Sequence, residues 1–333
     1  MREISIAFQT NKRASDYVAL AKQVNQYDFA AVSVYCDAPF HPSYGPLLLM
    51  APHITRARLG SAAVSPARMA PIDIAADAAL LDDVAPAGTY LGISRGAWLS
   101  DHGISEPSKP IQAIRETIEI IRALWRGESA AYHGQVYQIA AHVKAGYPLP
   151  QRPIPIMVGS WGAKLCAVAG ELADEVKVGG SANPDVVAHI RNFIAVGERI
   201  AQRPLGSVKI ALGAVTVVDA DRQAARHKAR QAAVLYLPVV APLDPSVQID
   251  PELIQRLQTY ADRGDFVAGA ALISDDILDR FAFSGNAHDI ITQCERLFAA
   301  GVDRIELGTP HGLQQAETGI DIIGRQVIPA LRR

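Results

Sequence analysis

Residues 58–96 read RLGSAAVSPARMAPIDIAADAALLDDVAPAGTYLGISRG and contain the pattern from which the fold is predicted. Two short apolar runs, Arg58–Val64 and Tyr90–Ile93, flank a segment from Ile72 to Val84 whose apolar residues recur at helical spacing. The runs are short and are bounded by glycine and proline, which is typical of buried strands. Because a helix between two strands returns the chain to the same edge of a sheet, the stretch predicts a βαβ unit with parallel strands.

The same alternation continues along the chain. Further strands are expected at Ile4–Phe8, Ala31–Tyr35, Ile156–Val158, Glu175–Val178, Val208–Val218 and Arg304–Leu307. Eight βα units in order, without a G-x-G-x-x-G motif after the first strand, favour closure into a barrel over an open sheet. The expected fold class is therefore α/β, a (β/α)8 TIM barrel with insertions.

Two segments do not fit a simple βα unit. Residues 132–137 predict a small β-hairpin before the fifth strand, and residues 219–285 are too long for an ordinary connection. We expect extra helices in the long segment, including Pro251–Tyr260 and Asp275–Phe283, that cover the barrel mouth or build a subunit contact. Residues 1–333 are otherwise expected to form one domain.

Composition excludes several classes of function. The formal net charge of -2 argues against a general nucleic-acid or membrane-surface binder. The three cysteines, Cys36, Cys166 and Cys294, lie far apart without zinc-ligand spacing, so we expect reduced thiols, no metal and a cytoplasmic location. The chain enters a strand-like run at once, so no signal peptide is expected, and its most apolar stretch, Ala232–Leu243, is too short to span a bilayer.

The active site of such a barrel lies at the C-terminal ends of its strands. The loops there include two glycine-rich turns ahead of helices, Gly159-Ser160-Trp161-Gly162 and Gly179-Gly180-Ser181. Backbone N–H groups free at a helix N-terminus suit a phosphate, whereas glycines can equally serve only to make tight turns. Both interpretations stay open from the residues alone.

Single polar residues in these loops also have two interpretations. Asp37 could orient a cofactor or cap a helix, and His41 could act in catalysis or be solvated. Arg95 could bind an anion or form a surface salt bridge, and Trp98 and Trp161 could stack on a planar ring or pack in a lid. The sequence contains no Ser-His-Asp pattern, HExxH motif or Walker motif.

Taken in order, these loops resemble the luciferase-like superfamily, and within it the coenzyme F420-dependent branch that includes methylenetetrahydromethanopterin reductase. The motifs that carry the resemblance are Leu59–Pro66, Leu91–Gly96, Arg115–Glu128, Ile156–Gly159, Gly264–Phe266 and Ser274–Asp276. Each motif is weak by itself, but their shared order and spacing over nearly the whole chain support the resemblance.

The resemblance implies a cofactor site. It implies a non-prolyl cis peptide at Ala63-Val64 that presses on the cofactor ring, and a phosphate held by the loops after the fifth and sixth strands. The cofactor-binding residues implied in this way are Tyr35, Ala63, Val64, Ser65, Ser94, Arg95, Gly96, Gly159, Ser160, Trp161, Gly162, Gly179, Gly180 and Ser181. Coenzyme F420 also has a carboxylate-rich tail that FMN lacks, and Arg95 and Lys164 are the candidate contacts for it.

The chain departs from its relatives at the groups that transfer protons. Ala7 stands where the reductase has glutamate, Tyr35-Cys36 where relatives often have Asp-His, and Ala97 where many have an acid. The remaining polar candidates for catalysis are Asp37, His41 and Gln9.

We therefore expect a homodimeric, F420-dependent oxidoreductase that transfers a hydride to or from a small organic substrate, which the sequence does not identify. An FMN-dependent luciferase-like monooxygenase is the first alternative. A cofactor- or partner-binding protein without turnover is the second.

Overall fold

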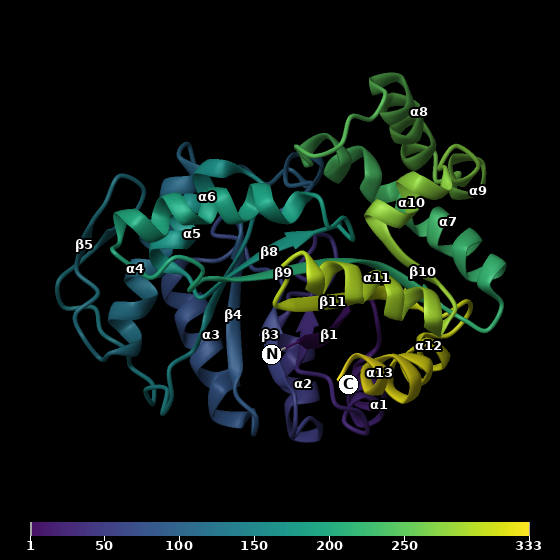
Figure 1. Ribbon diagram of the computed structural model, residues 1–333. Helices are drawn as coiled ribbons and strands as arrows, with labels where there is room; N and C mark the ends of the chain where they lie inside the picture. The colour runs from purple at the N-terminus through teal and green to yellow at the C-terminus, as the bar shows by residue number, and fades with distance from the viewer. Residues whose placement is uncertain (1, 333) are drawn as a thin grey trace.

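The computed structural model describes residues 2–332 and contains a closed barrel of eight parallel strands (Figure 1). Its strands are β1 (Glu3–Phe8), β2 (Ala31–Val34), β3 (Arg58–Ser61), β4 (Thr89–Ser94), β7 (Ile156–Gly159), β8 (Glu175–Gly179), β9 (Lys209–Val218) and β11 (Arg304–His311). Each strand pairs with the next, β11 lies between β9 and β1, and the pairing of β8 with β9 closes the ring. The predicted (β/α)8 fold is confirmed.

Helices cover the outside of the barrel with their apolar faces turned inward. They are α1 (Ala14–Val24), α2 (Tyr44–Met50), α3 (Pro71–Val84), α4 (Pro110–Trp125), α5 (Ala163–Leu172), α6 (Val186–Ile200), α11 (Ala287–Ala299), α12 (Ala316–Ile322) and α13 (Ile328–Leu331). In α4, Pro110 occupies the first turn, where no N–H is needed, and Ile114, Ile118 and Ile121 are buried. Within residues 2–332, no helix has the length and apolar character to cross a membrane.

The end of strand β3 differs from the prediction. β3 ends at Ser61 instead of Val64, because Ala62 and Ala63 leave the sheet, and Val64 then rejoins it only in a single bridge to Ile93. The non-prolyl cis peptide accordingly joins Ala62 to Ala63, so the expectation of Ala63-Val64 was wrong by one residue. Prolyl cis bonds occur at Ala38-Pro39 and Thr309-Pro310.

The long segment after β9 contains four α-helices that gather beside the barrel (Figure 1, green). They are α7 (Arg222–Val240), α8 (Pro251–Asp262), α9 (Phe266–Ala270) and α10 (Asp275–Phe281). The prediction of a helix to Phe283 was wrong at its end, because residues 282–285 form β10, which pairs with the last residues of β9 beyond the barrel. The predicted hairpin is β5 (Tyr132–His133) with β6 (Gln138–Ile139).

The barrel interior is polar and tightly filled. Tyr90 of β4 lies across Gly60 of β3, where a Cβ atom would collide with the tyrosine ring. Arg304 of β11 is buried and bonds Glu175 and Glu306, with its guanidinium 5.3 Å from the Tyr90 ring centroid. Burying these charges is tolerated because each has an opposite charge in contact.

Candidate active site

A cavity of about 810 Å³ opens at the C-terminal ends of the barrel strands. The ends of β2, β3, β4, β7 and β8 line one side, and helix α7 lines the other. Many of the predicted site residues meet here: Tyr35, Asp37, Ala63, Ser94, Arg95, Gly96, Gly159, Ser160, Trp161, Gly162, Gly179 and Gly180. The barrel thus brings together loops that are up to about 145 residues apart in sequence, from Tyr35 to Gly180.

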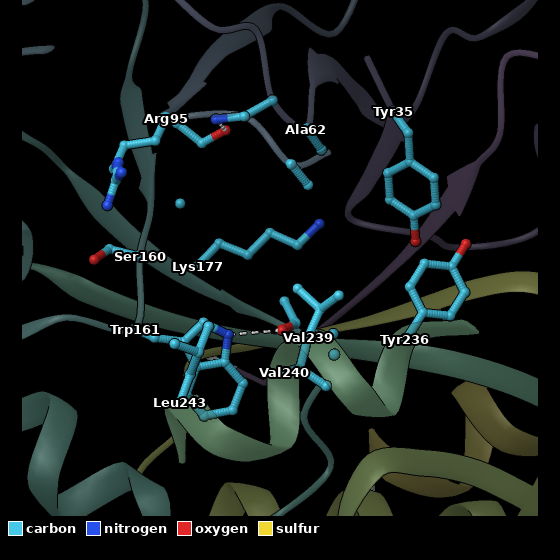
Figure 2. Close-up of a pocket in the computed structure, with 18 of the residues that line it drawn as sticks. Tyr35, Ala62, Arg95, Ser160, Trp161, Lys177, Tyr236, Val239, Val240 and Leu243 are labelled. Carbon is cyan, nitrogen blue, oxygen red and sulfur yellow. Dashed lines mark hydrogen bonds between the residues drawn. The ribbon is translucent and has the colours of Figure 1, made fainter. Parts of the chain in front are cut away.

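The two glycine loops lie side by side and are bonded to each other. The Trp161 Nε1–H donates to the Gly179 carbonyl oxygen at 2.9 Å, as Figure 2 shows. The Gly162 N–H donates to Ser160 Oγ at 3.1 Å, and Gly162 directly precedes helix α5. A Cβ atom on Gly162 or Gly179 would meet nothing within 4 Å, so both positions open onto free space. This arrangement can hold a phosphate at the positive end of α5.

Five predicted residues lie outside the cavity lining. Val64 and Ser65 are buried behind the Ala62-Ala63 turn, and the Ser65 hydroxyl donates to the Arg95 carbonyl. Ser181 is buried, with its Oγ accepting from the Asn183 N–H. His41 is exposed at the surface, and Gln9 lies behind Asp37. Their roles in binding and catalysis stay predictions, and these positions favour support of the site over contact with a ligand.

Asp37 is the acidic side chain of the cavity. Its Oδ2 accepts from Gln9 Nε2 at 3.0 Å. Burial raises the pKa of Asp37, although the Gln9 hydrogen bond and the charges of Lys177 and Arg68 oppose that rise. Asp37 can therefore exchange a proton closer to neutral pH than an ordinary aspartate.

Arg95 forms a salt bridge with Glu106 at the rim of the cavity. Its Nη2 lies 2.8 Å from Glu106, and half of its side chain is exposed. This geometry matches the surface-salt-bridge interpretation. A guanidinium that is already paired with Glu106 binds a further anion only weakly.

Lys177 was missed by the sequence analysis because it lies inside a strand. It projects from β8 into the cavity, forms an ion pair with Glu306 and lies 5.3 Å from the Tyr35 ring centroid. Burial alone would raise the pKa of Glu306, but the Lys177 and Arg304 charges outweigh it and lower that pKa. The alternation of Glu175 with Lys177 in β8, matched by Arg304 and Glu306 in β11, is the sequence signal that could have revealed this pair.

The wall opposite the strand ends comes from the helical segment. Val239, Val240 and Leu243 form an apolar surface near Trp161 (Figure 2). Tyr236 of α7 points its hydroxyl toward that of Tyr35, and its ring packs edge-on against Trp98 at 6.0 Å. Burial, with the nearby Asp37 charge, raises the pKa of Tyr236 to about 12, so its hydroxyl is a proton donor at neutral pH.

A closed (β/α)8 barrel with glycine loops and a largely apolar cavity at the C-terminal ends of its strands is typical of enzymes. The chain belongs to the luciferase-like monooxygenase family, which matches residues 4–304. The resemblance noted from the loop motifs is thereby confirmed.

The relatives of the chain include methylenetetrahydromethanopterin reductases and F420-dependent glucose-6-phosphate dehydrogenases. The 5,10-methylenetetrahydromethanopterin reductase of Archaeoglobus fulgidus is 27% identical over 298 residues, which cover 87% of each chain. An F420-dependent glucose-6-phosphate dehydrogenase of Nocardia farcinica is 22% identical and covers 83% of this chain and 80% of its own. The F420-dependent tetrahydromethanopterin reductase structure from Methanopyrus kandleri superposes with a TM-score of 0.89 at 23% identity, over 99% of both chains.

Proposed function

We propose that this protein is an oxidoreductase that uses coenzyme F420 to transfer a hydride to or from a small organic substrate. The observation that carries the proposal is the pair of open glycine loops, joined by the Trp161–Gly179 hydrogen bond, at one end of a cavity large enough for a ring and a substrate. The F420-dependent relatives, which span most of the chain, support the same cofactor.

The residues present fit such a cofactor. Gly159, Ser160, Gly162 and Gly179 would hold its phosphate, since Gly162 and Gly179 leave the space that a Cβ would fill. Ala62 and Ala63 would press on the ring, whose chemistry when bound is hydride transfer. The protein's own task is to align the substrate and exclude water from the apolar side of the cavity.

Fluorescence titration of the purified protein with coenzyme F420 and with FMN tests the proposal. We expect F420 to bind at least about tenfold more tightly, which corresponds to about 1.4 kcal/mol. Equal or tighter binding of FMN would favour the monooxygenase alternative. Tight F420 binding without turnover of any alcohol or carbonyl in a substrate panel would favour the binding-protein alternative.

We also propose a cytoplasmic homodimer. The three thiols are all buried and unpaired, which suits a reducing compartment. Helix α3 exposes Ile72, Leu80 and Val84 by 43%, 51% and 39%, an apolar face that a second copy could cover. Light scattering after size exclusion should give twice the chain mass, and Leu80→Glu should shift it toward one chain mass. A parent protein of one chain mass would contradict this proposal.

A further inference from the structure

The cavity contains a pair of hydroxyl groups whose purpose the cofactor does not explain. Tyr35, at the end of β2, and Tyr236, on α7, direct their hydroxyls toward each other on the side away from Ser160 and Trp161 (Figure 2). Within residues 2–332, neither hydroxyl hydrogen-bonds another protein group. Both tyrosines line the cavity, so the hydroxyls are free to bind a ligand there.

Two of the cations that line the cavity already have carboxylate partners. Three cationic side chains line the cavity among the described residues. Arg95 pairs with Glu106, Lys177 pairs with Glu306, and Lys164 lies beside the glycine loops at the phosphate end. An anionic substrate at the tyrosines would therefore find no free cation and would face the Asp37 carboxylate.

Apolar side chains also line the cavity. Ala214, Val215 and Leu237 line it together with the Trp98 ring that packs on Tyr236. A ligand with an apolar body and a single oxygen fits this region. Its apolar part would contact these side chains, and its oxygen would accept hydrogen bonds from the two tyrosine hydroxyls.

We propose that Tyr35 and Tyr236 bind the oxygen of a neutral, largely apolar carbonyl substrate, or of its alcohol, and that Tyr236 exchanges the proton with that oxygen. This inference rests on the proposed function. In the reducing direction the carbonyl carbon gains a hydride from the reduced coenzyme, and the oxygen gains a proton from the Tyr236 hydroxyl. Tyr236 regains a proton from solvent, which receives the proton that the reduced coenzyme releases. The net reaction converts carbonyl and reduced coenzyme into alcohol and oxidised coenzyme.

The neighbours of Tyr236 suit this role. Tyr236 lines the cavity, and burial raises the pKa of its hydroxyl to about 12, so the phenol is protonated at neutral pH. The missing acids at Ala7 and Ala97 leave no competing carboxyl from those two strand ends. Tyr35 lies against the Lys177–Glu306 pair and supplies the second hydrogen bond.

Binding calorimetry of the F420-loaded protein with two isosteric probes, cyclohexanone and methylenecyclohexane, tests the oxygen site. We expect the parent to prefer the ketone by at least about fivefold, and Tyr35→Phe and Tyr236→Phe each to reduce that preference. Tyr260→Phe removes a hydroxyl from the same helical segment outside the cavity and should keep it. No ketone preference in the parent, or one that both variants retain, would overturn the inference.

Turnover of cyclohexanone by the reduced coenzyme tests the proton role. We expect Tyr236→Phe to lower kcat at least about tenfold and Tyr35→Phe chiefly to raise KM. A parent that binds the ketone without reducing it, or a Tyr236→Phe enzyme with unchanged kcat, would overturn that role. A parent that does not bind F420 would overturn the proposed function as well, so the two failures are distinguishable.

Discussion

Lys177 of β8 and Glu306 of β11 form an ion pair at the base of the active-site cavity. Their side chains are 9% and 1% exposed, so little solvent screens the interaction. Arg304 contacts the other carboxylate oxygen of Glu306 at 3.1 Å. The pair joins two barrel strands that are not neighbours and keeps the cavity base electrically neutral.

Removing one partner should therefore destabilise the fold. Glu306→Gln leaves Lys177 and Arg304 without their shared carboxylate and should lower the unfolding free energy by about 3–5 kcal/mol, measured by urea denaturation. Glu106→Gln, which breaks the exposed Arg95 pair, should cost less than about 1 kcal/mol. Equal losses in the two variants would show that burial does not control the strength of these pairs.

Gly179→Val should weaken cofactor binding without unfolding the protein. A Cβ atom at Gly179 would meet no protein atom within 4 Å, so we expect a valine there to occupy the space of the phosphate. We expect the Kd for coenzyme F420 to rise at least about tenfold. Gly146→Val, at an open position outside the cavity, should leave the Kd unchanged. A folded Gly179→Val protein with the parent's affinity would place the phosphate elsewhere.

Lys164 and Arg95 should differ in their contribution to cofactor choice. Lys164 is exposed beside the glycine loops, whereas Arg95 is held by Glu106. Lys164→Ala should weaken F420 binding by about 1 kcal/mol, roughly fivefold, through loss of contact with the carboxylate tail, and should leave FMN binding unchanged. Arg95→Ala should affect neither ligand. Titration of both variants with both cofactors measures this, and a larger effect at Arg95 would reverse the assignment.

His311 should make the stability depend on pH. Burial lowers the pKa of His311 from 6.5 to about 4, so between these values the unfolded chain binds more protons than the folded chain. Stability is then full above pH 6.5 and falls as the pH drops toward 4, by roughly 3 kcal/mol in total. His311→Asn, which tolerates the positive φ of 72°, should flatten this dependence in urea titrations, whereas exposed His288→Asn should not. A slope unchanged in His311→Asn would assign the effect to other groups.

The order of strands and helices follows from the sequence, because burial imposes local patterns on each element. The apolar runs of 58–61 and 89–94 and the one-sided helix 110–125 show these patterns without any distant contact. Helix α11 is capped by the Asn286 side chain and is followed by Gly301 at a φ of 100°, and both features depend only on neighbouring residues. The glycine loops were recognisable for the same reason, since a short turn between strand and helix is a local event.

Contacts between distant segments were decided by the tertiary structure. Strand β10 forms because β9 continues past the barrel and offers an unpaired edge, which residues 282–285 alone do not indicate. Arg95 is paired with Glu106, and His41 is exposed at the surface, although both residues follow strands in the sequence.

The chemistry at the centre of the cavity depends most on the closed barrel. Lys177 meets Glu306 because β8 and β11 both flank β9, and Tyr236 meets Tyr35 because α7 folds back over the barrel mouth. Local sequence pattern was sufficient to predict the barrel and the glycine loops, and the order of the motifs was sufficient to place the chain in its family. The neutralised charges and the facing hydroxyls could be found only in the folded chain, because they depend on contacts between distant residues. Lys177 and Glu306 are 129 positions apart, and Tyr35 and Tyr236 are 201 positions apart.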